Sequence, residues 1–88
     1  MNDTSETKMT KQEPQLVASF PKNKREEVRV RLTEWEGKPY VDVRVFFATG
    51  EGDWVGTKKG IMMNADLLPE LADAIEKAGE VLAEVNNG

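Results

Sequence analysis

Apolar and polar residues alternate one by one from Val28 onwards. Val28, Val30 and Leu32 are apolar, and the residues between them are arginines. Alternation with a period of two and β-branched side chains predicts a strand with one buried face. Residues 40–47 repeat the pattern, with three valines at alternate positions. A turn is predicted between the two segments, at residues 36–39, because glycine and proline favour turns.

The polar face of this predicted hairpin gathers cationic and aromatic side chains. If the valines of both strands share one face, the residues between them share the other. The expected members are Arg29, Arg31, Trp35, Tyr40 and Arg44. Single-stranded nucleic acid exposes both phosphates and base faces, so cations beside flat rings suit its binding. Such residues also form ordinary cross-strand pairs on exposed sheets, and spacing alone leaves this interpretation open.

The rest of the chain predicts two more strands and a helix. Residues 54–57 and 61–63 are expected to be short strands joined by a tight basic turn. A helix follows, and Pro69 favours Asp66 over Asn64 as its N-cap because proline is tolerated in a first helical turn. The predicted fold is α+β, with a four-stranded antiparallel sheet followed by one long amphipathic helix (ββββα).

This helix carries an apolar stripe with the spacing of a helix–helix seam. The expected seam residues are Leu68, Leu71, Ile75, Ala78 and Leu82. Further apolar residues widen the stripe beyond what one small sheet needs. A domain of about 69 residues buries only roughly 60% of its unfolded surface, so we expect a homodimer formed through the helices. The alternative is a monomer whose helix covers only its own sheet.

Residues 1–19 are expected to be a disordered polar tail, because they contain almost nothing apolar before Leu16. Residues 20–88 would then form a single folded domain. No run of 18 apolar residues and no apolar segment of a signal peptide occurs, which argues against a membrane-spanning or secreted protein. We expect a cytoplasmic location.

Charge is distributed unevenly along the chain, whose formal net charge is −4. Residues 20–60 carry nine Lys or Arg against seven Asp or Glu, and they hold all six aromatic residues. Residues 61–88 carry one basic residue against six acidic ones. Because local charge determines the field near a surface, the middle segment is the one expected to meet a nucleic acid.

The absence of cysteine and histidine excludes several kinds of chemistry. Disulfides, zinc sites of the Cys/His type and Ser-His-Asp catalysis all need these residues. No Asp/Glu cluster has the spacing of a calcium loop. Paired carboxylates, a nucleophile with its base and a phosphate-cradling loop are not recognisable either. We expect no enzymatic activity, no cofactor and no metal.

Three motifs resemble the positive cofactor four family of transcriptional coactivators, in its C-terminal single-stranded-DNA-binding domain. They are RLTEWEGK at residues 31–38, YVDVR at 40–44 and KKGI at 58–61, followed by a capped helix. The resemblance implies a homodimer with packed helices, curved sheets that grip single strands, and a role at promoters or in handling melted DNA. The serine-rich and acidic run of the eukaryotic regulatory region does not precede the motifs, so a bacterial or phage form is expected.

The resemblance also implies binding roles for individual residues. Those matched by position are Trp35, Lys38, Arg44, Phe47, Lys58 and Lys59. Phe47 shares the alternation of the valines, so the local pattern predicts a core residue whereas the resemblance predicts a ligand contact. The family commonly has basic residues where this chain has Thr33, Glu36 and Val55, which predicts weaker and less electrostatic binding of DNA.

Two functions from different classes are therefore in view. The first is binding of single-stranded DNA, or of RNA or melted duplex, with little sequence preference. The protein would then act as a nucleoid-associated transcriptional coactivator or regulator. The alternative is a protein-interaction module of the transcription machinery with weak or no affinity for DNA, whose acidic surfaces contact a basic partner.

Overall fold

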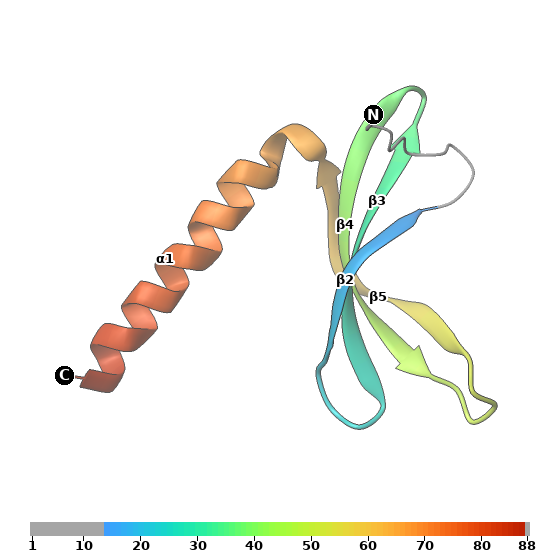
Figure 1. Cartoon of the computed structure of the whole chain (residues 1–88), viewed down its shortest axis with the longest axis horizontal. Helices are drawn as coiled ribbons and strands as arrows, with labels where there is room; N and C mark the ends of the chain where they lie inside the picture. Colours follow the sequence, from blue (N-terminus) through green and yellow to red (C-terminus); the bar gives the residue numbers. More distant parts are fainter. Residues whose placement is uncertain (1–13, 88) are drawn as a thin grey trace, which may run out of the picture.

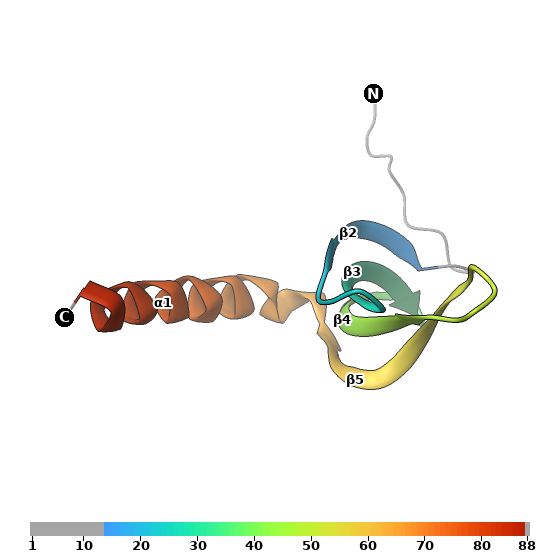
Figure 2. The same ribbon diagram turned by 90° about the horizontal axis from the view of Figure 1, so that it is seen from below.

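The chain folds into one antiparallel sheet followed by a helix, in a computed structural model that describes residues 14–87. The sheet order is β2-β3-β4-β5, and α1 runs obliquely away from the end of β5 (Figure 1). Seen from below, the strands curl round one another, so the sheet is curved (Figure 2). The elements are β2 (Gln15–Pro21), β3 (Glu26–Trp35), β4 (Lys38–Ala48), β5 (Trp54–Asn64), the 3-10 turn η1 (Ala65–Leu67) and α1 (Leu68–Asn87).

The predicted ββββα order is confirmed, but one of its strands comes from the segment expected to be a tail. Gln15–Ser19 lie in β2, which pairs with β3 through residue pairs such as Phe20 with Val28 and Ala18 with Val30. The disordered assignment is therefore wrong for these residues. All side chains of β2 are exposed, so the strand is held by its backbone pairing rather than by apolar burial. The rest of the predicted tail, residues 1–13, lies outside the described residues.

The basic turn predicted at residues 58–60 is also wrong, because β5 runs through it without interruption. The β4–β5 register shifts there: Arg44 pairs with Gly60, but Phe46 pairs with Gly56. The resulting bulge is closed by Thr57, whose hydroxyl donates to the Val45 carbonyl at 2.8 Å. A bulge bends its strand and increases the local twist. Two predicted short strands are thus one bent strand.

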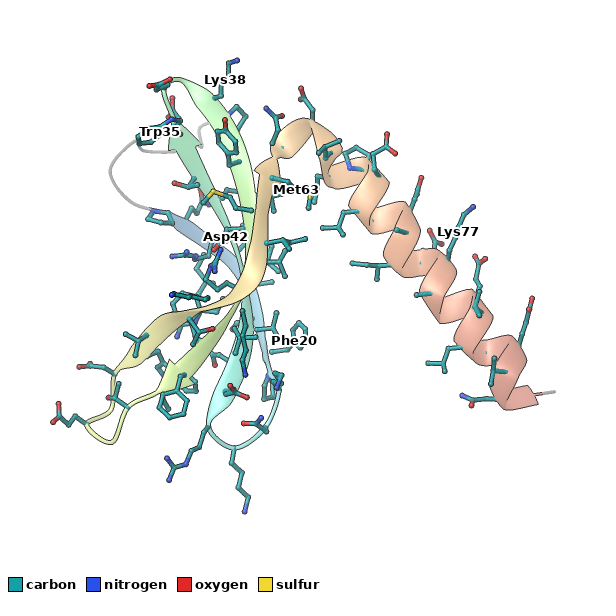
Figure 3. All side chains as sticks on the ribbon, turned by 180° about the vertical axis from the view of Figure 1, so that it is seen from behind. Phe20, Trp35, Lys38, Asp42, Met63 and Lys77 are labelled. Atoms are coloured by element: carbon teal, nitrogen blue, oxygen red, sulfur yellow. The ribbon has the colours of Figure 1, made fainter. Side chains whose placement is uncertain are left out.

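The β3–β4 register gives the sheet an apolar face and a polar face. Val28 lies opposite Val45, and Val30 lies opposite Val43. The apolar face, here called the valine face, is turned toward α1. Phe20 and Met63 lie on this side in Figure 3, whereas Trp35 and Asp42 lie on the side away from the helix. The predicted separation of the two faces is confirmed.

Asn64, and not the predicted Asp66, caps the helical segment. Its Oδ1 accepts a hydrogen bond from the Asp66 N–H at 2.8 Å. Asn64 takes this role because the 3-10 turn η1 lies between β5 and α1. The first N–H groups that need a capping acceptor are therefore those at the start of η1. Within residues 14–87, no helix is long and apolar enough to cross a membrane.

The first turns of α1 approach the valine face, but the remainder of the helix does not cover it. The hollow between the two is lined by Phe20, Val28, Val30, Val41, Val43, Leu68, Leu71, Ala72 and Ile75. Ile75 is 62% exposed and Leu82 is 59% exposed. Among the described residues only Val41, Asp42 and Phe46 are buried. One copy of the chain therefore leaves most of its apolar surface in contact with water.

Replacing Gly60 with alanine should destabilise the protein by roughly 2 kcal/mol or more, as expected for overpacking against rigid backbone. A Cβ at Gly60 would lie 2.5 Å from the Val43 carbonyl oxygen and 2.7 Å from the Arg44 Cα. Gly50→Ala is the matched control, because nothing lies within 4 Å of a Cβ there. Urea unfolding of the variants at one protein concentration measures the difference. Equal midpoints for the two variants would contradict the close approach of β4 and β5.

Candidate nucleic-acid interface

The side of the sheet away from α1 brings together the cationic and aromatic residues of the first hairpin. Arg29 lies opposite Arg44, and Trp35 lies opposite Lys38. Directly opposed residues of antiparallel strands point to the same face. The set, here called the arginine face, consists of Arg29, Arg31, Trp35, Lys38, Tyr40, Asp42 and Arg44. The predicted sharing of one face by the guanidinium groups and rings is confirmed.

A buried carboxylate lies at the centre of the arginine face. Asp42 is 1% exposed, is directly opposite Arg31 in the register, and lies two residues before Arg44 on the same strand. Arg31 donates to its Oδ2 from Nη2 at 2.7 Å and from Nε at 3.2 Å. Arg44 donates to its Oδ1 from Nη2 at 2.8 Å and from Nε at 3.1 Å. Both carboxylate oxygens are therefore occupied by guanidinium donors.

These hydrogen bonds decide the ionisation of Asp42. Burial, the largest single effect, raises the pKa of the carboxyl group by penalising its charged form. Hydrogen bonds from Arg44 and then Arg31, together with the charges of these arginines, outweigh burial and bring the pKa below its ordinary value. The same hydrogen bond raises the pKa of Arg44. Asp42 is thus a permanent negative charge near neutral pH.

Phe46 forms the floor of the arginine face at the end nearer the β4–β5 loop. It is 7% exposed, although it belongs to the polar side of the sheet. The Arg29 guanidinium carbon lies 4.5 Å from its ring centroid, and that of Arg31 lies 5.0 Å away. Arg29 also lies 5.6 Å from the Trp54 ring. These cation–π contacts hold two guanidinium groups over a ring that is largely shielded from solvent.

Trp35 forms an accessible aromatic surface at the opposite end of the arginine face. Trp35 is 66% exposed. An open hollow beside it is lined by Thr33, Glu34, Trp35, Tyr40 and Met62. Met62 comes from β5, where it lies opposite Asp42. A largely exposed flat ring with a hollow next to it has a shape that can stack a nucleobase.

Three of the predicted site residues, Phe47, Lys58 and Lys59, are not among the residues of the arginine face. Phe47 pairs with Glu26 and Val55, so the alternation of β4 directs it to the side of the valines. Lys59 lines a hollow with Val28, Val43 and Ile61, again on the side of the valines. Lys58 precedes Lys59 in the bulge of β5 and is exposed. The bulge accounts for the positions of the two lysines, because it interrupts the simple alternation of side chains along β5.

Sequence reasoning did not select Phe46 or Asp42 as site residues, although both fall on the expected face. Their alternation with Tyr40 and Arg44 placed them there. Their importance comes from contacts with the neighbouring strand β3, because Arg31 of β3 donates hydrogen bonds to Asp42 and Arg29 of β3 lies over the Phe46 ring. The available signal was an acidic residue that alternation places among the arginines on the polar face of the predicted hairpin.

Lowering the pH should reduce the stability difference between the wild-type protein and Asp42→Asn. At neutral pH the variant should be less stable by about 1–3 kcal/mol, because it loses charge-assisted hydrogen bonds. The Asp42 pKa is lower in the folded than in the unfolded chain, where it is near its ordinary value of 3.8. Its stabilisation is therefore full above about pH 4 and is lost as the pH falls through the folded-state pKa.

Urea unfolding of both proteins between about pH 2 and pH 7, at one protein concentration, measures this difference. The other carboxyl groups titrate in both proteins, so the comparison isolates Asp42. A difference that stays constant over the whole range would contradict a lowered pKa.

Two solved structures of a relative from Burkholderia pseudomallei, BPSL1147, a PC4 homolog, resemble this fold. One is 27% identical with a TM-score of 0.71 and covers 76% of this chain and 98% of its own. The other crystal form is 26% identical with a TM-score of 0.72 and covers 80% and 95%.

A bacteriophage T5 protein is similar over a larger part of this chain. It is a homolog of the eukaryotic transcription coactivator PC4 and is implicated in recombination-dependent DNA replication. It is 25% identical, with a TM-score of 0.59, and covers 84% of this chain and 89% of its own. A search of curated proteins found no significant match.

The family model described as Transcriptional Coactivator p15 (PC4) matches residues 22–74. This range contains β3, β4, β5 and the start of α1, and with them the whole arginine face. More than half of the chain is thus covered, and the similar structures are bacterial and phage homologs. The chain belongs to the PC4 family, as a form of bacterial or phage type.

Proposed function

We propose that the chain binds single-stranded DNA with little sequence preference, as a homodimer, and acts in transcription regulation or in the handling of melted DNA. The observation that carries the proposal is the arginine face, on which three guanidinium groups and an exposed tryptophan share one open side of a curved sheet. Cations follow the phosphates of a single strand while rings stack on its bases. The T5 relative's link to DNA replication supports a role at DNA.

Single strands fit this surface better than duplex DNA. Stacking on Trp35 requires an unpaired base, since a base within a duplex offers no free face. The helix α1 is not suited to bind in a groove of duplex DNA, because it is acidic. Its charged residues are Glu70, Asp73, Glu76, Lys77, Glu80 and Glu84. Duplex phosphates would be repelled from this helix.

We infer that contacts to the strand come mainly from the arginine face, with Trp35 and Tyr40 as stacking rings and Lys38 as a phosphate contact at its edge. Phe47, Lys58 and Lys59 would meet the strand only where it passes over the end of the sheet near the β5 bulge. Asp42 and Glu27 neutralise part of the arginine charge through Arg31, Arg44 and Arg29. Stacking should therefore supply a large share of the affinity.

The dimer proposal rests on apolar surface that one copy leaves open. The stripe of α1 and the valine face are on the same side of the sheet, and Ile75, Val81, Leu82 and Val85 are each more than half exposed. Soluble proteins rarely expose contiguous apolar patches of this kind. A second copy of the chain supplies a matching patch through two-fold symmetry. The seam would use Leu68, Leu71, Ile75, Ala78 and Leu82.

A second candidate function is a protein-interaction module of the transcription machinery with weak affinity for DNA. It is favoured by the partial neutralisation of the arginines and by the acidic surface of α1. Capture of a basic partner that survives replacement of Arg29, Arg31 and Arg44 together, in a protein that does not bind single strands, would support it. No enzymatic activity belongs to either proposal, and a cytoplasmic, nucleoid-associated location goes with the first.

Trp35→Ala should weaken binding to an oligo-dT strand by about 1–3 kcal/mol, the contribution of one stacked base. The melting temperature of the variant should stay close to that of the wild-type protein, because Trp35 is 66% exposed. Titration followed by fluorescence anisotropy of a labelled strand measures the affinity. A duplex of the same length is the control ligand, since its weak binding should not depend on Trp35. Absence of wild-type binding to oligo-dT at low salt would refute the proposed function.

Ile75→Glu should convert the proposed dimer into a monomer, because a charge would be buried in the seam at a cost of several kcal/mol. Lys77→Gln lowers the net charge by the same amount on the outer side of the same helix (Figure 3). This control should keep the dimeric mass in sedimentation velocity at equal concentration. A wild-type protein that sediments as a monomer would exclude the dimer.

A further inference from the structure

We propose that Asp42 is a positioning residue for DNA binding: it holds the guanidinium groups of Arg31 and Arg44 in fixed places on the arginine face. The inference rests on the proposed function, and it concerns a residue that itself touches no strand. Asp42 is 1% exposed, so its carboxylate cannot meet a phosphate or a base. Its effect on binding must therefore pass through the two arginines.

The geometry leaves each arginine with little freedom. Arg44 uses Nε and Nη2 on the carboxylate, and its Nη1 donates to the Thr57 carbonyl at 2.8 Å. All three of its nitrogens are therefore tied to β4 and β5. Arg31 uses Nε and Nη2 on the other carboxylate oxygen, while its guanidinium carbon lies 5.0 Å from the Phe46 ring centroid.

Donors nevertheless remain for a ligand. A guanidinium group has five N–H donors, and two to three per arginine are used inside the protein. In the described part of the chain, Nη1 of Arg31 makes no hydrogen bond. The side chains of Arg31 and Arg44 are 25% and 21% exposed, so their free edges reach the solvent. A strand would meet donors whose places are already determined, and it would not have to order two flexible side chains.

This arrangement makes an unusual prediction, because Asp42 carries the charge that DNA repels. By charge alone, removing the carboxylate should strengthen binding. By positioning, removing it should weaken binding, because an amide keeps one acceptor oxygen in place of two and no longer holds both arginines. The two effects have opposite signs, so one substitution distinguishes them.

Asp42→Asn and Glu27→Gln form a matched pair for this test. Each removes one negative charge from the same face, but within residues 14–87 the side chain of Glu27 pairs with Arg29 alone. We measure affinity for an oligo-dT strand at several salt concentrations. We expect Asp42→Asn to weaken binding by about tenfold, the equivalent of one charge-assisted hydrogen bond, and Glu27→Gln to leave it equal or tighter.

The salt dependence provides a second readout that partial unfolding would not change. Loss of one positioned phosphate contact should make the log–log slope shallower by about 0.7 in Asp42→Asn, whereas Glu27→Gln should leave it equal or steeper. If the wild-type protein binds and both variants bind with equal affinity and slope, the positioning role of Asp42 is refuted while the proposed function stands. If the wild-type protein does not bind, the proposed function itself fails.

Arg31→Lys decides the matter if Asp42→Asn does not fold. Lysine keeps the charge but has no fork of donors to hold the carboxylate oxygen by two bonds. We expect several-fold weaker binding, with Arg25→Lys in the β2–β3 loop as the control that stays within about twofold. Wild-type affinity in Arg31→Lys would overturn the proposal.

Discussion

The register between β3 and β4 is the constraint on which the rest of the molecule depends. Val28 and Val30 lie opposite Val45 and Val43, so the apolar side chains of both strands fall on one face. The arginines lie between the valines in sequence, so the same register places them on the other face. A shift of one residue would exchange the two faces, because side chains alternate with a period of two. The gathering of the valines on one face therefore also determines where the cations lie.

The arginine face brings three positive side chains close together and also holds them in fixed positions. Three arginines this close would repel one another and would need to be ordered at an entropic cost. Asp42 and Glu27 lower the repulsion, and Phe46 supports the guanidinium groups of Arg29 and Arg31 from below. The remaining positive charge is small. A strand held on this surface would depend on stacking and on well-placed donors more than on bulk attraction, which matches a chain whose overall charge is negative.

On the opposite face, one copy of the chain does not bury its apolar side chains. The sheet is too small and the helix too far from it for the apolar side chains to be buried, and only three described residues are buried. Figure 3 shows the two surfaces on opposite sides of the sheet: the valine face is on the side of α1, and the arginine face is on the other side. An assembly formed through the first surface would leave the second free, so proposed dimerisation and proposed DNA binding do not compete.

Alternation along residues 28–47 was sufficient to predict the central hairpin, its two faces and the three arginines, Trp35 and Tyr40 of the arginine face, because an apolar side imposes the pattern directly, whereas Lys38 came from the family resemblance. The helix was predictable from its spacing for the same reason. β2 was not, since its side chains are exposed and only backbone pairing holds it. The β5 bulge, the position of Lys59 and the role of Asp42 depend on which strands lie side by side. Local patterns record which side of an element is buried, whereas contacts between elements arise only when the chain has folded.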